Sequence, residues 1–347
     1  MHLDHGPAPQ LIHVPRPAEL PSDRTRAAAF DRAHGSARGH GRRSPCPYRA
    51  AIMGSMTSPP QRWARAERLD AARTLDALRE RTGVRLTLDG PCPGGQVGTA
   101  YVRWPDHRRS VLKWRPHSRV ADLEAGPLTV SRVLRHAGCP APATELAAQV
   151  GHAVVMVQEL LPGTKIDHLD HDVLVQALEL NRLQAGRLTD HPGVPATELF
   201  LRQDGPGYCL HEPLRRHGRR SAALEHRVAA IGADHPDRLA GDDAVHMDFH
   251  PGNLLATGGS ITGVVDWDGA ARGDHRFDLV TLRFGIHGGG ADPGVARHLD
   301  AVLDAVPEDV LRPAWAHMSL RMVDWAIRHF APSDVEHWLD LAEQRVS

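Results

Sequence analysis

Residues 246–253 of this 347-residue chain read His-Met-Asp-Phe-His-Pro-Gly-Asn, and residues 263–268 read Gly-Val-Val-Asp-Trp-Asp. The first segment places Asp248 and Asn253 five positions apart, in a stretch whose Pro and Gly favour a loop. The second segment is apolar and β-branched, which predicts a short strand ending at Asp266. Carboxylate and amide oxygens are ligands that Mg²⁺ accepts. The two segments therefore predict one site rich in oxygen ligands.

The order of these groups is the order in which enzymes of phosphoryl transfer hold Mg²⁺ against phosphates. On this hypothesis Asp248 orients or deprotonates an acceptor hydroxyl, Asn253 ligates Mg²⁺, and Asp266 bridges Mg²⁺ to the phosphates. His246 would brace the loop through hydrogen bonds. Two alternatives stay open. One is an ordinary turn, and the other is a transition-metal site of His246, Asp248 and His250, because imidazole and carboxylate suit zinc or iron.

These segments, together with Gly-Asp-His-Arg-Phe-Asp-Leu at 273–279, resemble the aminoglycoside phosphotransferase family. That family has H-x-D-x-H-P-x-N in its loop, two hydrophobic residues and D-W/F at its metal strand, and then G-D-x-x-x-D-L. Protein kinases carry Arg after the loop His and Asp-Phe-Gly at the metal strand, where this chain has Met247 and Asp-Trp-Asp. The resemblance implies a two-lobed, protein-kinase-like α+β fold, with a five-stranded antiparallel N-terminal sheet and a mainly helical C-terminal lobe. It also implies an ATP- and Mg²⁺-dependent kinase acting on a hydroxyl of a small molecule.

Lysine is rare in this chain, because only two of the 41 basic residues are lysines, Lys113 and Lys165. A position that keeps Lys against so strong a bias toward Arg needs a compact ammonium rather than a forked guanidinium. Lys113 lies in an apolar, strand-like run at 110–114. The resemblance implies that it pairs with the α- and β-phosphates of ATP. The alternative is a Lys that protects an exposed sheet edge.

Glu124, followed by Ala125, resembles the acid of the family's Glu-Ala pair, which opens the helix that positions the Lys, and it would then pair with Lys113. Gly126 and Pro127 follow directly, so the helix is either kinked there or begins at Pro127. The alternative for Glu124 is a solvated acid in the first turn of a helix.

Four further residues are expected to contact the nucleotide. Gly95 and Gly98 lie in a Gly-rich segment upstream of the Lys, where glycine lets backbone amides approach phosphates closely. A hairpin turn would look the same. The apolar run at 153–163 ends in Leu-Pro-Gly and resembles the family's hinge, whose backbone at Gln158 and Leu160 would bind the adenine edge.

Composition divides the chain into three parts. Residues 1–60 are dominated by Pro, Gly, His and Arg, which predicts a disordered extension or a mis-annotated start. Residues 61–158 are expected to form the ATP-binding lobe, and residues 159–347 the catalytic and acceptor-binding lobe. The scattered cysteines and the lack of a signal peptide or of a ~20-residue apolar span favour a cytoplasmic protein without a membrane segment.

Hydrophobic periodicity predicts the elements within these parts. The expected strands span 84–88, 99–104, 110–114, 144–148 and 154–159. The expected helices span 63–81, 128–136, 173–184, 222–231, 295–306, 314–329 and 334–344.

Charge is distributed unevenly along the chain. Residues 1–158 hold 23 basic against 13 acidic residues, and residues 159–347 hold 18 against 29. An acidic acceptor lobe favours a cationic small molecule, such as an aminoglycoside-like antibiotic or a metabolite. Neither nucleic acid nor a membrane is expected as a partner, and we expect a monomer or a weak dimer. Two other functions stay open, a non-catalytic nucleotide-binding protein of the same fold and a His/Asp metal-dependent hydrolase.

Overall fold

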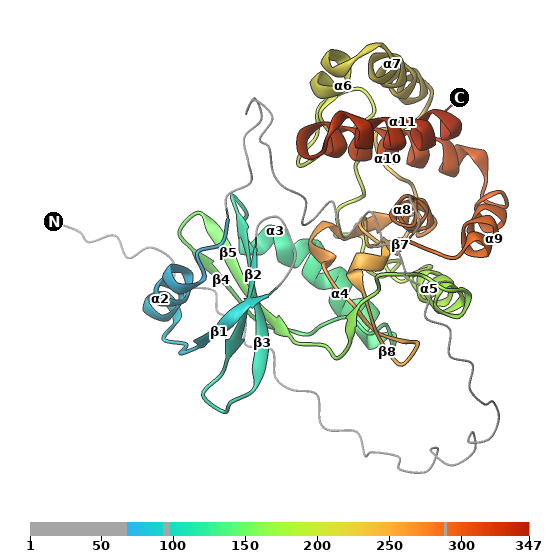
Figure 1. The fold of residues 1–347 in the computed structure, drawn as a ribbon. Helices are drawn as coiled ribbons and strands as arrows, with labels where there is room; N and C mark the ends of the chain where they lie inside the picture. Colours follow the sequence, from blue (N-terminus) through green and yellow to red (C-terminus); the bar gives the residue numbers. More distant parts are fainter. Residues whose placement is uncertain (1–67, 93–97, 288–289, 347) are drawn as a thin grey trace, which may run out of the picture.

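The structure is a computed structural model, and it describes residues 68–92, 98–287 and 290–346. A lobe built on an antiparallel sheet lies beside a mainly helical lobe (Figure 1). This architecture confirms the predicted two-lobed α+β fold. The prediction of a disordered extension or a mis-annotated start at residues 1–60 concerns residues outside the described ranges.

The sheet has five strands in the order β1-β2-β3-β5-β4, and every neighbouring pair is antiparallel. Four strands agree with the predicted ranges to within two residues, whereas the first is displaced from 84–88. It is an edge strand with a bulge between Leu88 and Gly90, and a sheet edge tolerates the proline that follows. The strands are β1 (Thr87–Cys92), β2 (Thr99–Arg103), β3 (Arg109–Pro116), β4 (Thr144–Val150) and β5 (Ala153–Glu159).

Helices cover both faces of this sheet. Helix α2 (Ala71–Thr82) buries Leu78 in a cluster with alternate residues of the strands, including Val155 and Val157. On the other face, Val154 and Met156 pack against the next two helices of the chain. Because β5 is covered on both faces, its sequence is a continuous apolar run rather than an alternating one.

The next two helices meet at a glycine. Helix α3 (Val120–Ala125) ends at Gly126, whose φ of −116° and ψ of −104° are not helical, and α4 (Pro127–His136) begins at the proline. The prediction that a helix begins at Pro127 is therefore confirmed. The preceding helix α3 was not predicted, because its six residues are too few to show a hydrophobic period.

The helical lobe contains α5 (His171–Leu183), α6 (His211–His217), α7 (Arg219–Asp234), α8 (Phe277–Gly285), α9 (Pro293–Leu303), α10 (Glu308–His329) and α11 (Pro332–Arg345). The sequence predicted neither α6 nor α8. Helix α8 is buried on nearly all sides, so it shows no amphipathic stripe. The prediction that a helix begins at residue 314 was wrong, because α10 starts at Glu308 and contains Pro313. No helix of the described residues is long and apolar enough to cross a membrane.

Short strands in this lobe position the loops between the helices. Strand β7 (Asp243–Val245) pairs with β10 (Ala271–Gly273), and β8 (Leu254–Thr257) pairs with both β6 (Thr164–Lys165) and β9 (Ser260–Val264). The 246–253 segment therefore starts where β7 ends, and Asp266 follows the end of β9.

Candidate active site

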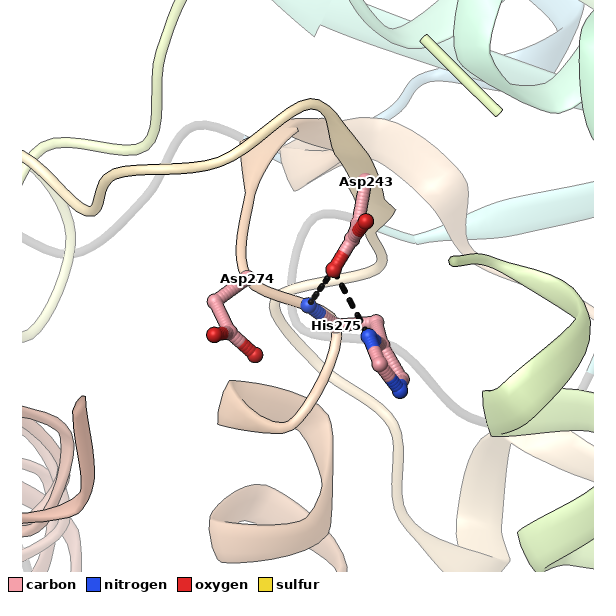
Figure 2. A group of neighbouring side chains, drawn as sticks. All are labelled: Asp243, Asp274 and His275. Atoms are coloured by element: carbon pink, nitrogen blue, oxygen red, sulfur yellow. Dashed lines mark hydrogen bonds and ion pairs between the residues drawn. The ribbon is translucent and has the colours of Figure 1, made fainter. Parts of the chain in front are cut away.

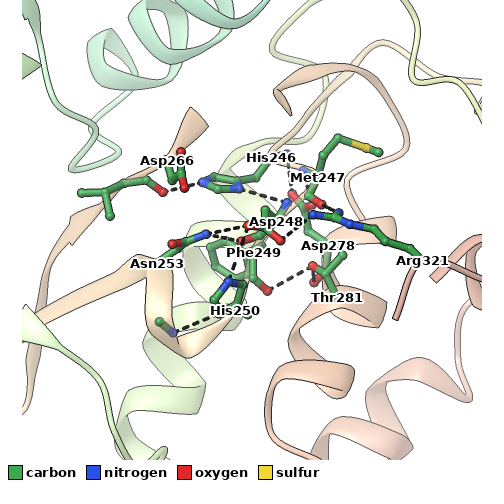
Figure 3. A network of polar contacts seen from close by, with 12 residues as sticks. His246, Met247, Asp248, Phe249, His250, Asn253, Asp266, Asp278, Thr281 and Arg321 are labelled. Atoms are coloured by element: carbon green, nitrogen blue, oxygen red, sulfur yellow. Dashed lines mark hydrogen bonds and ion pairs between the residues drawn. The ribbon is translucent and has the colours of Figure 1, made fainter. Parts of the chain in front are cut away.

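The loop that starts at His246 is held by its backbone. The buried carboxylate of Asp278, in α8, accepts hydrogen bonds from His246 N (2.7 Å) and Met247 N (2.9 Å). Met247 has a φ of 70°, which is uncommon for a residue other than glycine. Its carbonyl oxygen accepts from Arg321 in α10 at 2.6 Å (Figure 3). Buried partners thus impose a strained turn just before Asp248.

His246 is completely buried, and both of its ring nitrogens have backbone partners. Nε2 lies 3.0 Å from the Val265 carbonyl oxygen, and Nδ1 lies 3.2 Å from the backbone nitrogen of Asp248. These partners define the tautomer, because Nε2 must donate and Nδ1 must accept. Burial lowers the pKa of His246 to about 4, so the ring is neutral at pH 7. Neither nitrogen is left to bind a metal, which removes an imidazole from the predicted His/Asp metal site.

The Asp248 carboxylate is anchored at both oxygens and still reaches solvent. Oδ2 accepts from Asn253 Nδ2 at 3.0 Å, and Oδ1 accepts from the Arg321 guanidinium at 2.9 Å (Figure 3). Burial opposes ionisation, but Arg321 and the nearby His250 hold the pKa of Asp248 well below its usual range. The side chain remains 36 % exposed. Asp248 is therefore an ionised acceptor with a fixed orientation and access to a ligand.

The two expected metal ligands are Asn253 and Asp266. A backbone hydrogen bond from Val265 N to the Asn253 carbonyl oxygen (2.9 Å) holds these two parts of the chain together. The Asn253 side-chain nitrogen donates to the Asp248 carbonyl oxygen and carboxylate, which turns its Oδ1 away from both. Asp266 has a φ of 68° and pairs with Lys113 through Oδ1 alone. Within the described ranges, Asn253 Oδ1 and Asp266 Oδ2 accept no hydrogen bond. Two hard oxygen donors of this kind fit Mg²⁺.

Lys113 reaches this strand end from β3. Its Nζ lies 2.7 Å from Asp266 Oδ1 and 2.9 Å from Asp268 Oδ1. Burial opposes the charge, but the two carboxylates raise the pKa of Lys113 above its ordinary value. Arg115, two residues further along β3, contacts the other oxygen of Asp268 at 3.4 Å. The ammonium therefore lies directly beside Asp266, one of the two expected metal ligands.

The predicted pair between Lys113 and Glu124 does not form. Glu124 instead accepts from Arg132 of α4 at 2.9 Å. The break at Gly126 separates the short helix of Glu124 from α4, and the arginine eight positions further on then reaches back to the acid. Asp268 takes the place that was predicted for Glu124 beside the Lys.

The nucleotide-binding predictions concern residues farther from this cluster. Gly95 lies outside the described residues. Gly98 has a φ of 84°, which favours glycine at the start of β2. Gln158 has Val111 and Thr144 as cross-strand neighbours, so an adenine contact from its backbone would compete with sheet pairing. Leu160 lies just beyond the end of β5, and the contact of its backbone with adenine stays a prediction.

Two residues of the site were not predicted. The sequence contained an indication for Asp268, because this acid lies two positions after Asp266 and its negative charge suits a ligand of a cation. It contained none for Arg321, since this residue is one Arg of many and lies 73 positions after Asp248 on a helix. Only the packing of α10 against the catalytic loop brings it to the carboxylate.

A second polar cluster lies at the other end of β7. The ligand atoms of Asp243, Asp274 and His275 all lie within 4.8 Å of one another (Figure 2). Asp243 accepts from Gly186 N and from both the backbone and the ring of His275. Asp274 accepts from the backbone and guanidinium of Arg276. Through its hydrogen bonds to His275, Asp243 connects β7 to the turn before α8.

The fold and the site define a kinase-like class of enzymes for phosphoryl transfer. A model of the phosphotransferase enzyme family matches residues 90–319, and the chain belongs to this family. The resemblance to the aminoglycoside phosphotransferase family is thereby confirmed, and the chain is a phosphotransferase. A comparison with curated proteins finds no match.

Solved structures of small-molecule kinases share the fold. A thermostable mutant of aminoglycoside phosphotransferase APH(4)-Ia, in a ternary complex with AMP-PNP and hygromycin B, is 17 % identical with a TM-score of 0.56. The alignment covers 80 % of this chain and 98 % of that one. Amicoumacin kinase hAmiN, in complex with AMP-PNP, Ca²⁺ and Ami, is 15 % identical with a TM-score of 0.56, covering 80 % and 93 %. At these identities the comparison concerns the fold.

Proposed function

We propose that this phosphotransferase moves the γ-phosphate of ATP to a hydroxyl of a small molecule, with Mg²⁺ as cofactor. The observation that carries the proposal is the convergence of Asp248, Asn253, Asp266 and Lys113, which come from three separate parts of the sequence. Phosphoryl transfer depends on placing such groups around the phosphates rather than on covalent chemistry by the protein.

Each group has one part in the reaction. Asp248 accepts a hydrogen bond from the acceptor hydroxyl and directs its oxygen toward the γ-phosphate. Its low pKa makes it a weak base, which suits a loose transition state in which the proton leaves late. Asn253 and Asp266 would hold Mg²⁺, which neutralises charge on the phosphates when bound. Lys113 would exchange its carboxylate partners for phosphate oxygens.

The acceptor class is a finer part of the proposal. The related folds in complex with hygromycin B and Ami support an antibiotic or a similar polyhydroxylated molecule. The acidic excess of residues 159–347 supports a cationic one. Close to the reacting position, however, the Asp248 charge is balanced by Arg321. A long-range field and the local pair therefore make separate contributions to acceptor choice.

The decisive assay combines the protein with Mg·ATP and a panel of acceptors, namely hygromycin B, other aminoglycosides, peptide antibiotics, macrolides and amino alcohols. We expect ADP release that depends on one acceptor class, and a product heavier by one phosphoryl group. Asp248→Asn is the matched control, and it should lower turnover by ~10²–10⁴-fold while ATP affinity stays within a few-fold. Undiminished turnover in this variant would contradict the role of Asp248.

The same assay separates the alternatives. ATP binding without transfer to any member of a broad panel would favour a non-catalytic nucleotide-binding protein. The hydrolase alternative requires tightly bound zinc or iron, which metal analysis of the purified protein would detect. The occupied ring nitrogens of His246 argue against that outcome.

A further inference from the structure

Arg321 connects the acceptor-side helix to the catalytic loop at two points. From α10, one guanidinium nitrogen donates to the Met247 carbonyl oxygen (2.6 Å), and another donates to Asp248 Oδ1 (2.9 Å) (Figure 3). A planar guanidinium fixes the angle between two such bonds, which a Lys ammonium cannot do. One side chain thus holds both the strained backbone before Asp248 and the carboxylate itself.

This contact completes the immobilisation of the carboxylate. Without Arg321, Oδ2 would keep Asn253 at 3.0 Å and His250 at 3.6 Å, while Oδ1 would lose the donor that fixes its position. With Oδ1 on Arg321, both oxygens have fixed partners, and the side chain is still 36 % exposed. Effective positioning of a reacting hydroxyl requires a carboxylate whose orientation does not vary.

The helix that carries Arg321 is itself anchored along the same face. His317 Nδ1 accepts from Phe200 N at 3.2 Å, and Asp324 Oδ2 accepts from Leu210 N at 2.9 Å. These residues lie four positions before and three positions after Arg321, so all three share one side of α10. Both acceptor side chains are buried, and the two backbone donors lie in the segment before α6. The guanidinium is therefore presented from a rigid support.

We propose that Arg321 is the positioning residue for the acceptor step, which sets the orientation of the Asp248 carboxylate toward the acceptor hydroxyl. This inference rests on the proposed function, since it assigns to Asp248 the hydroxyl-binding role. Arg321 differs from a purely structural arginine because it contacts both the Asp248 carboxylate and the backbone before it, so its loss should change the orientation of that carboxylate.

The first test needs no acceptor. Crystal structures of the full chain compare the orientation of the Asp248 carboxylate in the wild type, Arg321→Met and Arg321→Lys. In the wild type the carboxylate should hold one orientation, whereas in Arg321→Met it should rotate, because Oδ1 loses its partner. Arg321→Lys, which keeps the charge without the fork, should lie between the two and keeps the test available if the Met variant does not fold.

Arg312→Met is the control on the same helix. It removes an exposed Arg–Glu pair, with Glu308 as the partner, near the start of α10. Thermal melting of both Met variants reports general damage to the helical lobe. Only Arg321→Met should change the orientation of the Asp248 carboxylate. An unchanged orientation in Arg321→Met, or an equal change in Arg312→Met, would overturn the proposal.

Kinetics provide the second test, with Mg·ATP and the acceptor that the panel identifies. Arg321→Met should lower kcat by about 10²-fold, the cost of a misplaced reacting group, with KM for ATP within a few-fold. A rise in KM for ATP without loss of kcat would overturn the proposal. If the wild type transfers no phosphate, the proposed function fails, and the crystal structures still decide whether Arg321 orients Asp248.

Discussion

The proposed nucleotide side of the site, around Lys113, and the proposed acceptor side, around Asp248, are held by different kinds of contact. On the nucleotide side, Lys113 meets Asp266 and Asp268 only through side-chain ion pairs between residues more than 150 positions apart. On the acceptor side, many contacts involve the backbone of the loop, as where Asp278 accepts the N–H groups of His246 and Met247.

The difference indicates which part of the site rearranges. An ammonium can exchange one anion for another at little cost, so phosphate oxygens can replace the carboxylates beside Lys113. A loop held by buried backbone hydrogen bonds cannot exchange partners in this way, because each unpaired buried group costs about 1–3 kcal/mol. We infer that nucleotide binding reorganises the Lys113 cluster, whereas Asp248 is in position beforehand.

Among the variants that test this comparison, replacement of Lys113 should reduce turnover most. Lys113→Ala should reduce turnover by about 10²-fold or more, because a preorganised charge at the phosphates is lost. Lys113→Arg should restore little, since a planar fork cannot place a point charge where an ammonium was. Steady-state ADP release measures both. Lys165→Arg, at the other Lys of the chain, is the control that should retain full activity. Wild-type turnover in Lys113→Arg would remove Lys113 from the site.

A pH profile tests the acceptor side. Burial raises the pKa of Asp278 to about 7, although the N–H groups that it accepts favour its ionised form. Below that pH a proton on either oxygen displaces one of the two N–H donors, so the turn at Met247 loosens. Activity should therefore fall as pH drops from 8 to 6. Asp278→Asn resembles the protonated form, so its rate should be about tenfold lower and flat over this range. If the same fall in activity between pH 8 and 6 persists in Asp278→Asn, another group is responsible for it.

The smallest effects separate two acids near the Lys. Glu124→Gln breaks only a pair with Arg132 at the surface, and such pairs contribute ~0–1 kcal/mol. It should change turnover by no more than a few-fold. Asp268→Asn removes a direct partner of Lys113 and should cost more, mainly as a higher KM for ATP. A larger effect of Glu124→Gln than of Asp268→Asn would show that Glu124 pairs with Lys113 when nucleotide is bound. That pair is the one that the sequence predicts.

The residues proposed for the reaction could be predicted from the sequence where they lie close together along the chain. Asp248, Asn253 and Asp266 fall within about twenty positions and have a fixed chemical order. Lys113 was accessible because the composition makes a lysine conspicuous. Its partner was not, because the break at Gly126 decides whether Glu124 faces the Lys or Arg132.

Local sequence determined the sheet strands, the catalytic loop and the class of chemistry, because turn residues, apolar runs and oxygen ligands act over a few positions. Tertiary structure alone decided that Arg321 reaches Asp248, that Asp268 replaces Glu124, and that His246 uses both nitrogens on the backbone. These contacts join residues separated by up to about 150 positions. Their geometry depends on how whole helices pack, and no short-range pattern in the chain encodes that packing.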